Sequence, residues 1–428
     1  MDGKDDFHGN RDFYHLVKIV SKHIIEKRKD KIIDEDTLLE CAINGIERNF
    51  SGLKLESEKK TSSEIFKEYF KDFYPQYQIS KEYNVLARIK ENINDLKSRY
   101  LLIISKSYLS TFLLPSILLS EDKKEYCFYI GSKLKNDLNS EEYAIKVLNK
   151  IQLYMEKGGI LFLKNLETVY PSMYDLFNQN FTVVGNKNYA RLAVGSTTNN
   201  FALINNNFKC IINVDNDKID KEEPPFLNRF EKHILSLDNL LSQDLIEQSD
   251  KIKSIFDELI IYDNKVYNGI DYDLKSLLIN CNLDEIKALI YQANKEGKSK
   301  DEMFDYVLSY ISLTLPQDIL SVLRINGFMQ KYQQYFNKFV EYYEKGEHSN
   351  ISNFLKKMEG RKNVIYTFSN NLEKMEIKNV ENPKYGSITK KDIYEINITS
   401  IKSENELERQ LFIFYKRDFK VCIIKFMP

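Results

Sequence analysis

The chain has 428 residues with 62 Lys+Arg and 63 Asp+Glu, so its formal net charge is −1. This length suits two or three domains, and the balanced charge argues against nucleic acid as a partner. With 15 glycines and 8 prolines, the chain is not rich in linkers or disorder. Its five cysteines lie far apart, which favours reduced thiols in the cytoplasm and argues against a metal site. No apolar run approaches the ~20 residues of a membrane span.

The first part of the chain predicts helices. Apolar residues recur at three- and four-residue spacing over residues 12–50, which is typical of amphipathic helices. Residues 55–63 are polar and form a candidate linker. An aromatic stripe at helical spacing follows over residues 66–74. This stripe suits either core packing or a surface that faces a partner.

The middle of the chain predicts an α/β domain. Short apolar runs predict strands of a parallel sheet that is buried on both faces. These runs cover residues 99–107, 126–130, 158–164 and 208–214. Ser140 opens a helix that runs to about Glu156, and Gly158 stops it before the central strand. A polar helix is expected over residues 170–179, and helices throughout 235–357.

An internal repeat favours tandem modules. Residues 361–370 resemble residues 99–106, and residues 419–425 resemble the strand at 160–164. Pairing Ser105 with Ser369, and Lys164 with Pro428, gives a separation of 264 residues in both cases. The chain therefore stops at the central strand of a second copy, which predicts that it is a fragment.

Arg229 is the strongest single candidate for chemistry. The order strand, helix, strand and then an arginine on a turn opened by Pro224 and Pro225 is that of an AAA+ ATPase core. In ring ATPases such an arginine reaches the γ-phosphate of the neighbouring module and stabilises charge during phosphoryl transfer. The alternative is a structural arginine paired with Glu231 or another acid.

A nucleotide site of the chain's own would lie at the ends of the predicted strands. Lys106, with Ser107 beside it, follows the first strand, where a phosphate-binding lysine is expected. The glycines of GxxxxGK[ST] are missing, and without them backbone amides cradle phosphates less easily. A solvated lysine at a strand end is the alternative.

The acid pair that would bind Mg²⁺ and activate water is also missing. Lys164 and Asn165 stand where the central strand should end in acids, so robust hydrolysis by this module is not expected. Glu167 and Asp175 are the nearest acids and the remaining catalytic candidates. Asn207 could orient a water or a phosphate, but its place in an Asn-rich turn favours a turn residue.

Several segments, in this order, resemble the giant mysterin-type E3 ubiquitin ligases, which carry a dynein-like row of AAA+ modules. They are residues 170–179, 189–195, 208–212 and 225–233. The resemblance implies an AAA+ α/β fold, an ATP/Mg²⁺ cofactor, and a parent protein that is an ATPase and a ubiquitin–protein transferase. Pro171 stands where the family has a glutamate, which argues against hydrolysis more than against nucleotide binding. This chain has neither the RING of the family nor a standard pair of Walker motifs.

The resemblance also implies a division of the chain. Near the start, it makes Arg11 a sensor-2 arginine that contacts nucleotide held by a preceding module. The expected parts are a helical lid remnant (residues 1–55), an AAA+ large subdomain (60–243), a helical lid or connecting subdomain (244–360) and the start of a following module (361–428). The expected partners are the neighbouring modules of the same chain, and the ubiquitin machinery through domains that lie outside it.

The first hypothesis is thus an ATP-binding part of an AAA+ motor core that couples nucleotide to conformation. The second is a catalytically inert AAA+-fold scaffold or protein-interaction module. The repeat disfavours a third hypothesis, a helical adaptor unrelated to AAA+ proteins.

Overall fold

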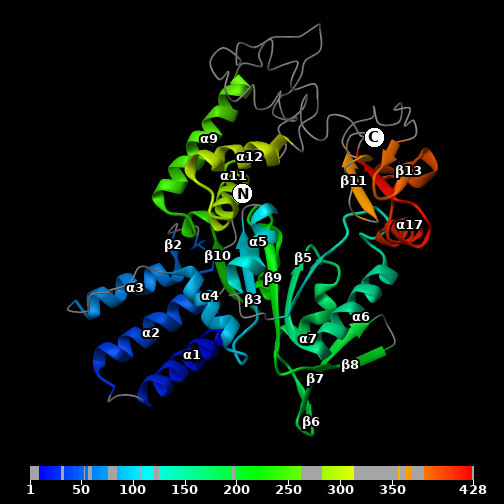
Figure 1. Cartoon of the computed structure of the whole chain (residues 1–428). Helices are drawn as coiled ribbons and strands as arrows, with labels where there is room; N and C mark the ends of the chain where they lie inside the picture. The colour runs from blue at the N-terminus through cyan, green and yellow to red at the C-terminus, as the bar shows by residue number, and fades with distance from the viewer. Residues whose placement is uncertain are drawn as a thin grey trace. The chain divides into compact units, whose positions relative to one another are not determined.

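The computed structural model divides into two compact units, residues 1–132 with 139–240, and residues 133–138 with 241–428. Each is described here by itself (Figure 1). The structure describes residues 9–29, 33–52, 54–55, 60–75, 84–105, 108–119, 125–194, 198–261, 282–312, 355–356, 358, 360, 362–367 and 380–426. No helix in these ranges is both long enough and apolar enough to cross a membrane.

The first unit opens with four helices, of which the sequence predicted the first three. They are α1 (Asn10–Arg28), α2 (Glu35–Phe50), α3 (Ser62–Phe73) and α4 (Val85–Asn94), with the short strands β1 (Lys54–Leu55) and β2 (Lys60–Thr61) between α2 and α3. The side chain of Asp34 caps α2 by accepting a hydrogen bond from the amide of Thr37. In Figure 1, α1, α2 and α3 lie side by side.

The aromatic stripe of α3 is not part of the core. Phe66, Tyr69 and Phe73 are 41%, 61% and 78% exposed. Of the two interpretations of this stripe, core packing is therefore wrong. The remaining interpretation, a face that meets a partner, stays a prediction.

A five-stranded parallel sheet forms the centre of the first unit. Its order is β10 (Glu231–Leu235), β3 (Leu101–Ser105), β9 (Phe208–Asp215), β5 (Gly159–Lys164) and β4 (Tyr126–Ile130). The prediction of four parallel strands in one sheet is confirmed. The fifth strand, β10, was missed because the residues after Arg229 were interpreted as the end of a turn.

Helices flank this sheet and complete its core (Figure 1). Helix α5 (Tyr108–Leu118) follows β3, and α6 (Glu141–Lys157) precedes β5. Val147, Ile151 and Met155 of α6 belong to one buried cluster with residues of β3, β5 and β9. Gly159 starts β5 with a φ of 99°, and a Cβ there would lie 2.6 Å from the carbonyl oxygen of Glu125. Only glycine fits both conditions, so this turn sets the start of the central strand.

A small antiparallel sheet lies between the central strand and β9 in the sequence. After the 3₁₀ turn Tyr170–Met173 and the short helix α7 (Tyr174–Phe177), the chain forms β6 (Thr182–Val184), β7 (Lys187–Val194) and β8 (Thr198–Ile204). These three strands were not predicted from the sequence. The signal was present, because Gly185, with a φ of 62°, and Asn186 form a two-residue hairpin turn between Val184 and Lys187.

Buried ion pairs bind the N-terminal helices to the sheet. The guanidinium of Arg48 on α2 donates to both carboxylate oxygens of Glu231 on β10, at 3.0 and 2.8 Å, and both side chains are 1% exposed. Asn92 of α4 and His233 of β10 complete the hydrogen bonding of that carboxylate, at 2.6 and 3.1 Å. Two charged side chains can be buried here only because they are paired and hydrogen-bonded. The helices expected to be a separate lid remnant thus share one compact unit with the sheet, and the expected domain division stays a prediction.

The described part of the second unit is helical and then α/β. It contains α9 (Gln243–Ile261), α11 (Leu283–Lys295) and α12 (Lys300–Ser312), and the short 3₁₀ turn Leu237–Asn239 precedes α9 in the chain. The expected helices over residues 262–281 and 313–354 lie outside the described residues. The later elements are β11 (Asn363–Thr367), β12 (Val380–Asn382), β13 (Gly386–Ile388), β14 (Ile393–Asn397), α17 (Glu404–Lys416) and β15 (Val421–Lys425).

The second parallel sheet repeats part of the first. Its order is β11-β15-β14, and β15 pairs in parallel with both of its neighbours. In both sheets a strand, a helix and a parallel strand follow one another, as β4, α6, β5 and as β14, α17, β15. The predicted separation of 264 residues is wrong. The equivalent strands β5 and β15 end at Lys164 and Lys425, which are 425 − 164 = 261 positions apart. Ser369 and Pro428 lie outside the described residues.

Candidate functional site

The carboxyl ends of β3, β9 and β5 bring a set of polar side chains together. The carboxyl ends of parallel strands meet at one edge of a sheet, where ligands of open α/β folds bind. In register, Ser105 of β3 lies beside Asp215 of β9, and Asn213 of β9 lies beside Lys164 of β5. Thr111, in the first turn of α5, joins this group and is fully buried. We call these five residues the carboxyl-edge cluster.

Lys164 is the centre of the carboxyl-edge cluster. Its Nζ donates to Thr111 Oγ1 and to Asn213 Oδ1, at 2.9 Å in both cases, and forms an ion pair with the carboxylate of Asp215. The Lys164 side chain is 1% exposed. An ammonium group is costly to bury without partners. These three oxygens, one of them charged, make the burial tolerable.

Asn213 connects this lysine to the first strand. Its Nδ2 donates to the carbonyl oxygen of Ile103 at 3.1 Å and to Ser105 Oγ at 3.0 Å. Its Oδ1 also accepts from Thr111 Oγ1 at 2.9 Å. Asn213, Thr111 and Asp215 were not among the residues predicted from the sequence. A polar residue interrupting the apolar strand β9 was the available signal for Asn213.

A second lysine lies at the rim of the cluster. Lys218 Nζ lies 3.5 Å from Asp215 Oδ2 and donates to Asn165 Oδ1 at 3.1 Å. Asn165 has a φ of 54°, a left-handed conformation that asparagine adopts more easily than most residues. The side chain of Asn165 is therefore held by the protein's own lysine.

The cluster does not fit a divalent cation. In P-loop ATPases, Mg²⁺ is held by a Ser or Thr at the start of the helix and by an Asp at the end of a neighbouring strand. Thr111 supplies such a hydroxyl, but the strand-end position carries the ammonium of Lys164. This positive charge repels a metal ion at the place where the ion would lie. Among the described residues, no group of three His, Cys, Asp or Glu side chains could hold a metal either.

The connection from β3 to α5 is short for a phosphate loop. Lys106 and Ser107 fall outside the described residues, and they alone separate Ser105 from Tyr108. A P-loop places a longer run of backbone amides between strand and helix, around the phosphates. The predicted roles of Lys106 and Ser107 stay predictions.

The other predicted polar residues lie apart from the cluster. Glu167 is exposed in the turn after β5. Asp175 of α7 forms an ion pair with Arg191 of β7, with 2.9 Å between Oδ2 and Nε. Asn207 lies at the amino end of β9, where its carbonyl oxygen accepts from the amide of Gly159. The structure therefore does not assemble these residues with Lys164.

Arg229 is held on the face formed by α7 and α8 (Pro224–Leu227). The centre of its guanidinium lies 3.8 Å from the ring centroid of Tyr174, a cation–π contact, and NH1 donates to the carbonyl oxygen of Pro225. The side chain is half-buried. Its Nε is buried and has no hydrogen-bond partner among the described residues. No described acid forms an ion pair with Arg229, which argues against a purely structural arginine.

Arg11 lies on the same face as Arg229. Its NH1 donates to Asn178 Oδ1 at 2.7 Å, directly after α7, and its side chain is exposed. Burial is the main cause that lowers the pKa of Arg229, and the nearby charge of Arg11 lowers that pKa further. Two arginines, 218 positions apart in the chain, thus present positive charge from one surface. This is the kind of site that binds phosphate.

Arg99 ties the two arginines together. Its NH1 donates to Asp12 Oδ1 at 2.8 Å and to the carbonyl oxygen of Asn228 at 3.3 Å. Asp12 follows Arg11 in α1, and Asn228 precedes Arg229. The Arg99 side chain is buried. Arg99 therefore holds in place the two segments that carry Arg11 and Arg229.

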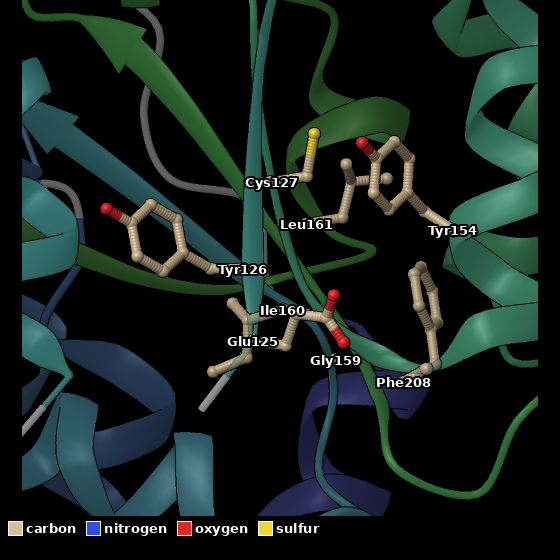
Figure 2. A pocket seen from close by; sticks show the side chains of 9 residues that line it. Glu125, Tyr126, Cys127, Tyr154, Gly159, Ile160, Leu161 and Phe208 are labelled. Carbon is tan, nitrogen blue, oxygen red and sulfur yellow. The ribbon is translucent and has the colours of Figure 1, made fainter. Parts of the chain in front are cut away.

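A hollow opens at the opposite edge of the main sheet (Figure 2). Glu125, Gly159 and Phe208, at the amino ends of β4, β5 and β9, line it together with Cys127 and Tyr154. Figure 2 shows the Cys127 sulfur and the Tyr154 hydroxyl pointing toward one another. The hollow has room for little more than a water molecule, so it is not a nucleotide site.

Comparison with known families and proteins agrees with this fold. Residues 90–241 match the family described as RNF213 AAA domain. The E3 ubiquitin-protein ligase RNF213 of Homo sapiens is 28% identical over 278 residues, which is 61% of this chain and 5% of that protein. E3 ubiquitin-protein ligase rnf213-beta of Danio rerio is 28% identical over 54% of this chain and 4% of that protein. A Dictyostelium discoideum protein, described as an uncharacterized transmembrane protein, is 26% identical over 80% of this chain and 6% of its own length.

The chain therefore spans only about 5% of the length of the relatives it matches. Among solved structures, the Pyrococcus furiosus Hef helicase domain aligns with 79% of this chain and 84% of its own, at 12% identity and a TM-score of 0.19. That score is too low to support an argument about the fold.

Proposed function

We propose that the chain serves in a row of AAA+ modules, because residues 90–241 match the family described as RNF213 AAA domain. In this row it supplies arginines to the nucleotide of the module before it. Its own carboxyl edge is not used for hydrolysis. The parallel sheet flanked by helices is the fold that such a module requires.

The observation that carries this proposal is the pairing of Arg11 with Arg229 on one face. A phosphoryl group in transfer is stabilised by positive charge from a finger arginine that a neighbour supplies. Arg229 has the free Nε and the preorganised position that this role needs. Arg11, as the sensor-2 arginine of the same neighbouring site, contacts the same nucleotide. ATP and Mg²⁺ are then cofactors of the preceding module.

The buried ion pairs support a second part of the proposal, conformational coupling. Arg48 and Glu231 join α2 to β10, and Arg99 joins α1 to the loop of Arg229. Buried, paired side chains transmit displacement because their geometry is fixed. A change at the neighbouring nucleotide therefore moves α1, α2 and the sheet as one body. We propose that this movement reaches ubiquitin-transfer domains, which lie outside this chain, in the cytoplasm.

A double-mutant cycle tests whether Arg11 and Arg229 serve one nucleotide. ATP turnover is measured in a longer protein that joins this chain to the preceding module, with Arg11→Ala, Arg229→Ala and both changes. Residues that act on the same phosphates lose catalysis non-additively. We expect the double variant to lose less than the product of the two single losses. Independent, multiplicative losses would contradict a shared site, and no loss in any variant would favour an inert scaffold.

A binding experiment tests the chain's own site. We expect no saturable binding of a non-hydrolysable ATP analogue with Mg²⁺ up to about 1 mM, which corresponds to about −4 kcal/mol. The reason is the ammonium of Lys164 at the metal position. Isothermal titration calorimetry of the chain and of its Lys106→Ala variant measures the binding of this analogue. Saturable binding that Lys106→Ala abolishes would show instead that this site takes nucleotide.

A further inference from the structure

We propose that the ammonium of Lys164 is a built-in cation that replaces the divalent metal of a P-loop site. It holds α5, β5 and β9 in one arrangement whether or not nucleotide is present. This inference deepens the proposed function, since it explains why the chain's own carboxyl edge does not act. The strand end has not only lost the acid of P-loop ATPases, because the lysine that stands in its place has a structural role of its own.

The oxygens around Lys164 are arranged as a cation's ligands. They come from three places: the Thr111 hydroxyl on α5, the Asn213 amide on β9 and the Asp215 carboxylate at the end of β9. Hydroxyl, amide and carboxylate oxygens are the ligands that hard cations take in proteins. In this protein they converge on a nitrogen instead. One side chain thus does what a bound ion does elsewhere, which is to join a helix to two strands.

Distance and charge match ammonium and not a divalent ion. The two neutral oxygens lie 2.9 Å from Nζ, the spacing of N–H···O hydrogen bonds, whereas Mg²⁺ requires oxygens at 2.0–2.1 Å. Asp215 supplies one negative charge, and two ammonium groups already share it, that of Lys164 and that of Lys218, 3.5 Å from Asp215 Oδ2. A divalent ion in the same place would lack a second carboxylate. The cluster therefore has no negative charge left to balance a metal ion.

The second unit has a lysine at the same position. Lys425 ends β15 and pairs in register with Asn397 of β14, as Lys164 ends β5 and pairs with Ile130 of β4. Lys425 is also buried, and its Nζ donates to Glu395 Oε2 at 3.0 Å. Two sheets of one chain thus carry a lysine at the strand end where P-loop ATPases carry an acid. This second occurrence supports the inference independently of the Lys164 contacts.

An aspartate at position 164 should create a binding site for a divalent metal ion. In the Lys164→Asp variant, two carboxylates and the Thr111 hydroxyl face one space, so the variant needs a cation for stability. We expect its Tm to rise by several degrees in millimolar MnCl₂ or MgCl₂ alone, and EDTA to reverse the rise. Wild-type protein and Lys164→Met, which restores no carboxylate, should not respond. A response of wild type, or no response of Lys164→Asp, would overturn the inference.

A second measurement covers the case in which Lys164→Asp does not fold. If Lys164 is the main counter-ion of Asp215, Lys164→Met should lower Tm by roughly 5 °C or more, because it leaves this partly buried carboxylate with only the more exposed and more distant Lys218 as a cationic partner. Adding Asp215→Asn should then lower Tm no further. Additive losses would show that the two side chains act separately and would also overturn the inference. Neither result depends on Arg229, so the proposed function can fail while this inference holds, and the reverse.

Discussion

Replacing Arg229 with alanine should lower ATP turnover by about 10³-fold or more in a protein that includes this chain and the module before it. Arginines that reach a neighbour's γ-phosphate contribute on the order of 10³–10⁵ to turnover. The guanidinium is preorganised by the Tyr174 ring and by the Pro225 carbonyl, so it can meet the phosphate without searching for its conformation. Steady-state ATPase assays measure the change. An unchanged rate would refute the assignment.

Two further variants make this experiment specific. Arg229→Lys keeps the charge but loses the planar fork, so it should recover only a part of the lost rate. Arg191→Ala is the matched control, because Arg191 is an exposed arginine with a single ion pair to Asp175. Such a surface pair contributes about 0–1 kcal/mol, so turnover should stay close to that of wild type. Urea unfolding of Arg229→Ala should remain close to wild type as well, because the side chain is half exposed.

Replacing Glu231 with glutamine should lower the free energy of unfolding of the chain by about 3–5 kcal/mol. The substitution leaves Arg48 buried and charged, with only the carboxylate of Asp95, 3.9 Å from its NH1, to balance it. It also weakens the hydrogen bonds from Asn92 and His233. Urea unfolding followed by circular dichroism measures the loss. Glu68→Gln is the control, since its ion pair with Lys60 is exposed and should change stability by less than about 1 kcal/mol.

The same carboxylate makes stability depend on pH. Burial raises the pKa of Glu231, but the charge and hydrogen bonds of Arg48, with those of His233, lower it more, so the pKa in the folded protein is below its usual 4.5. The unfolded chain therefore binds more protons, and stability rises with pH in this range. The contribution of Glu231 is complete above about pH 4.5 and is lost as the pH falls toward the folded pKa. The acid slope of wild-type stability should be steeper than that of Glu231→Gln, and equal slopes would contradict this origin.

Local patterns in the sequence determined most of the main sheet and its helices. Apolar runs of five to eight residues predicted β3, β5 and β9, because a parallel strand that is buried on both faces has little room for polar side chains. A similar run predicted β4, which is the partly exposed edge strand. Ser140 and Gly158 bounded α6 through capping, which depends on neighbours in the sequence alone. The turn that carries Arg229 was also predicted from neighbouring residues alone, because Pro224 and Pro225 open it.

Only the tertiary structure decided what Lys164 does. The sequence analysis treated it as the absence of an acid, whereas the structure surrounds its ammonium with Thr111, Asn213 and Asp215, which lie 53, 49 and 51 positions away. Arg11 and Arg229 also became neighbours only through folding. A strand or a helix follows from residues a few positions apart, but the role of a buried charge depends on the partners that share its cavity. Those partners come together when the sheet forms, and no local pattern specifies them.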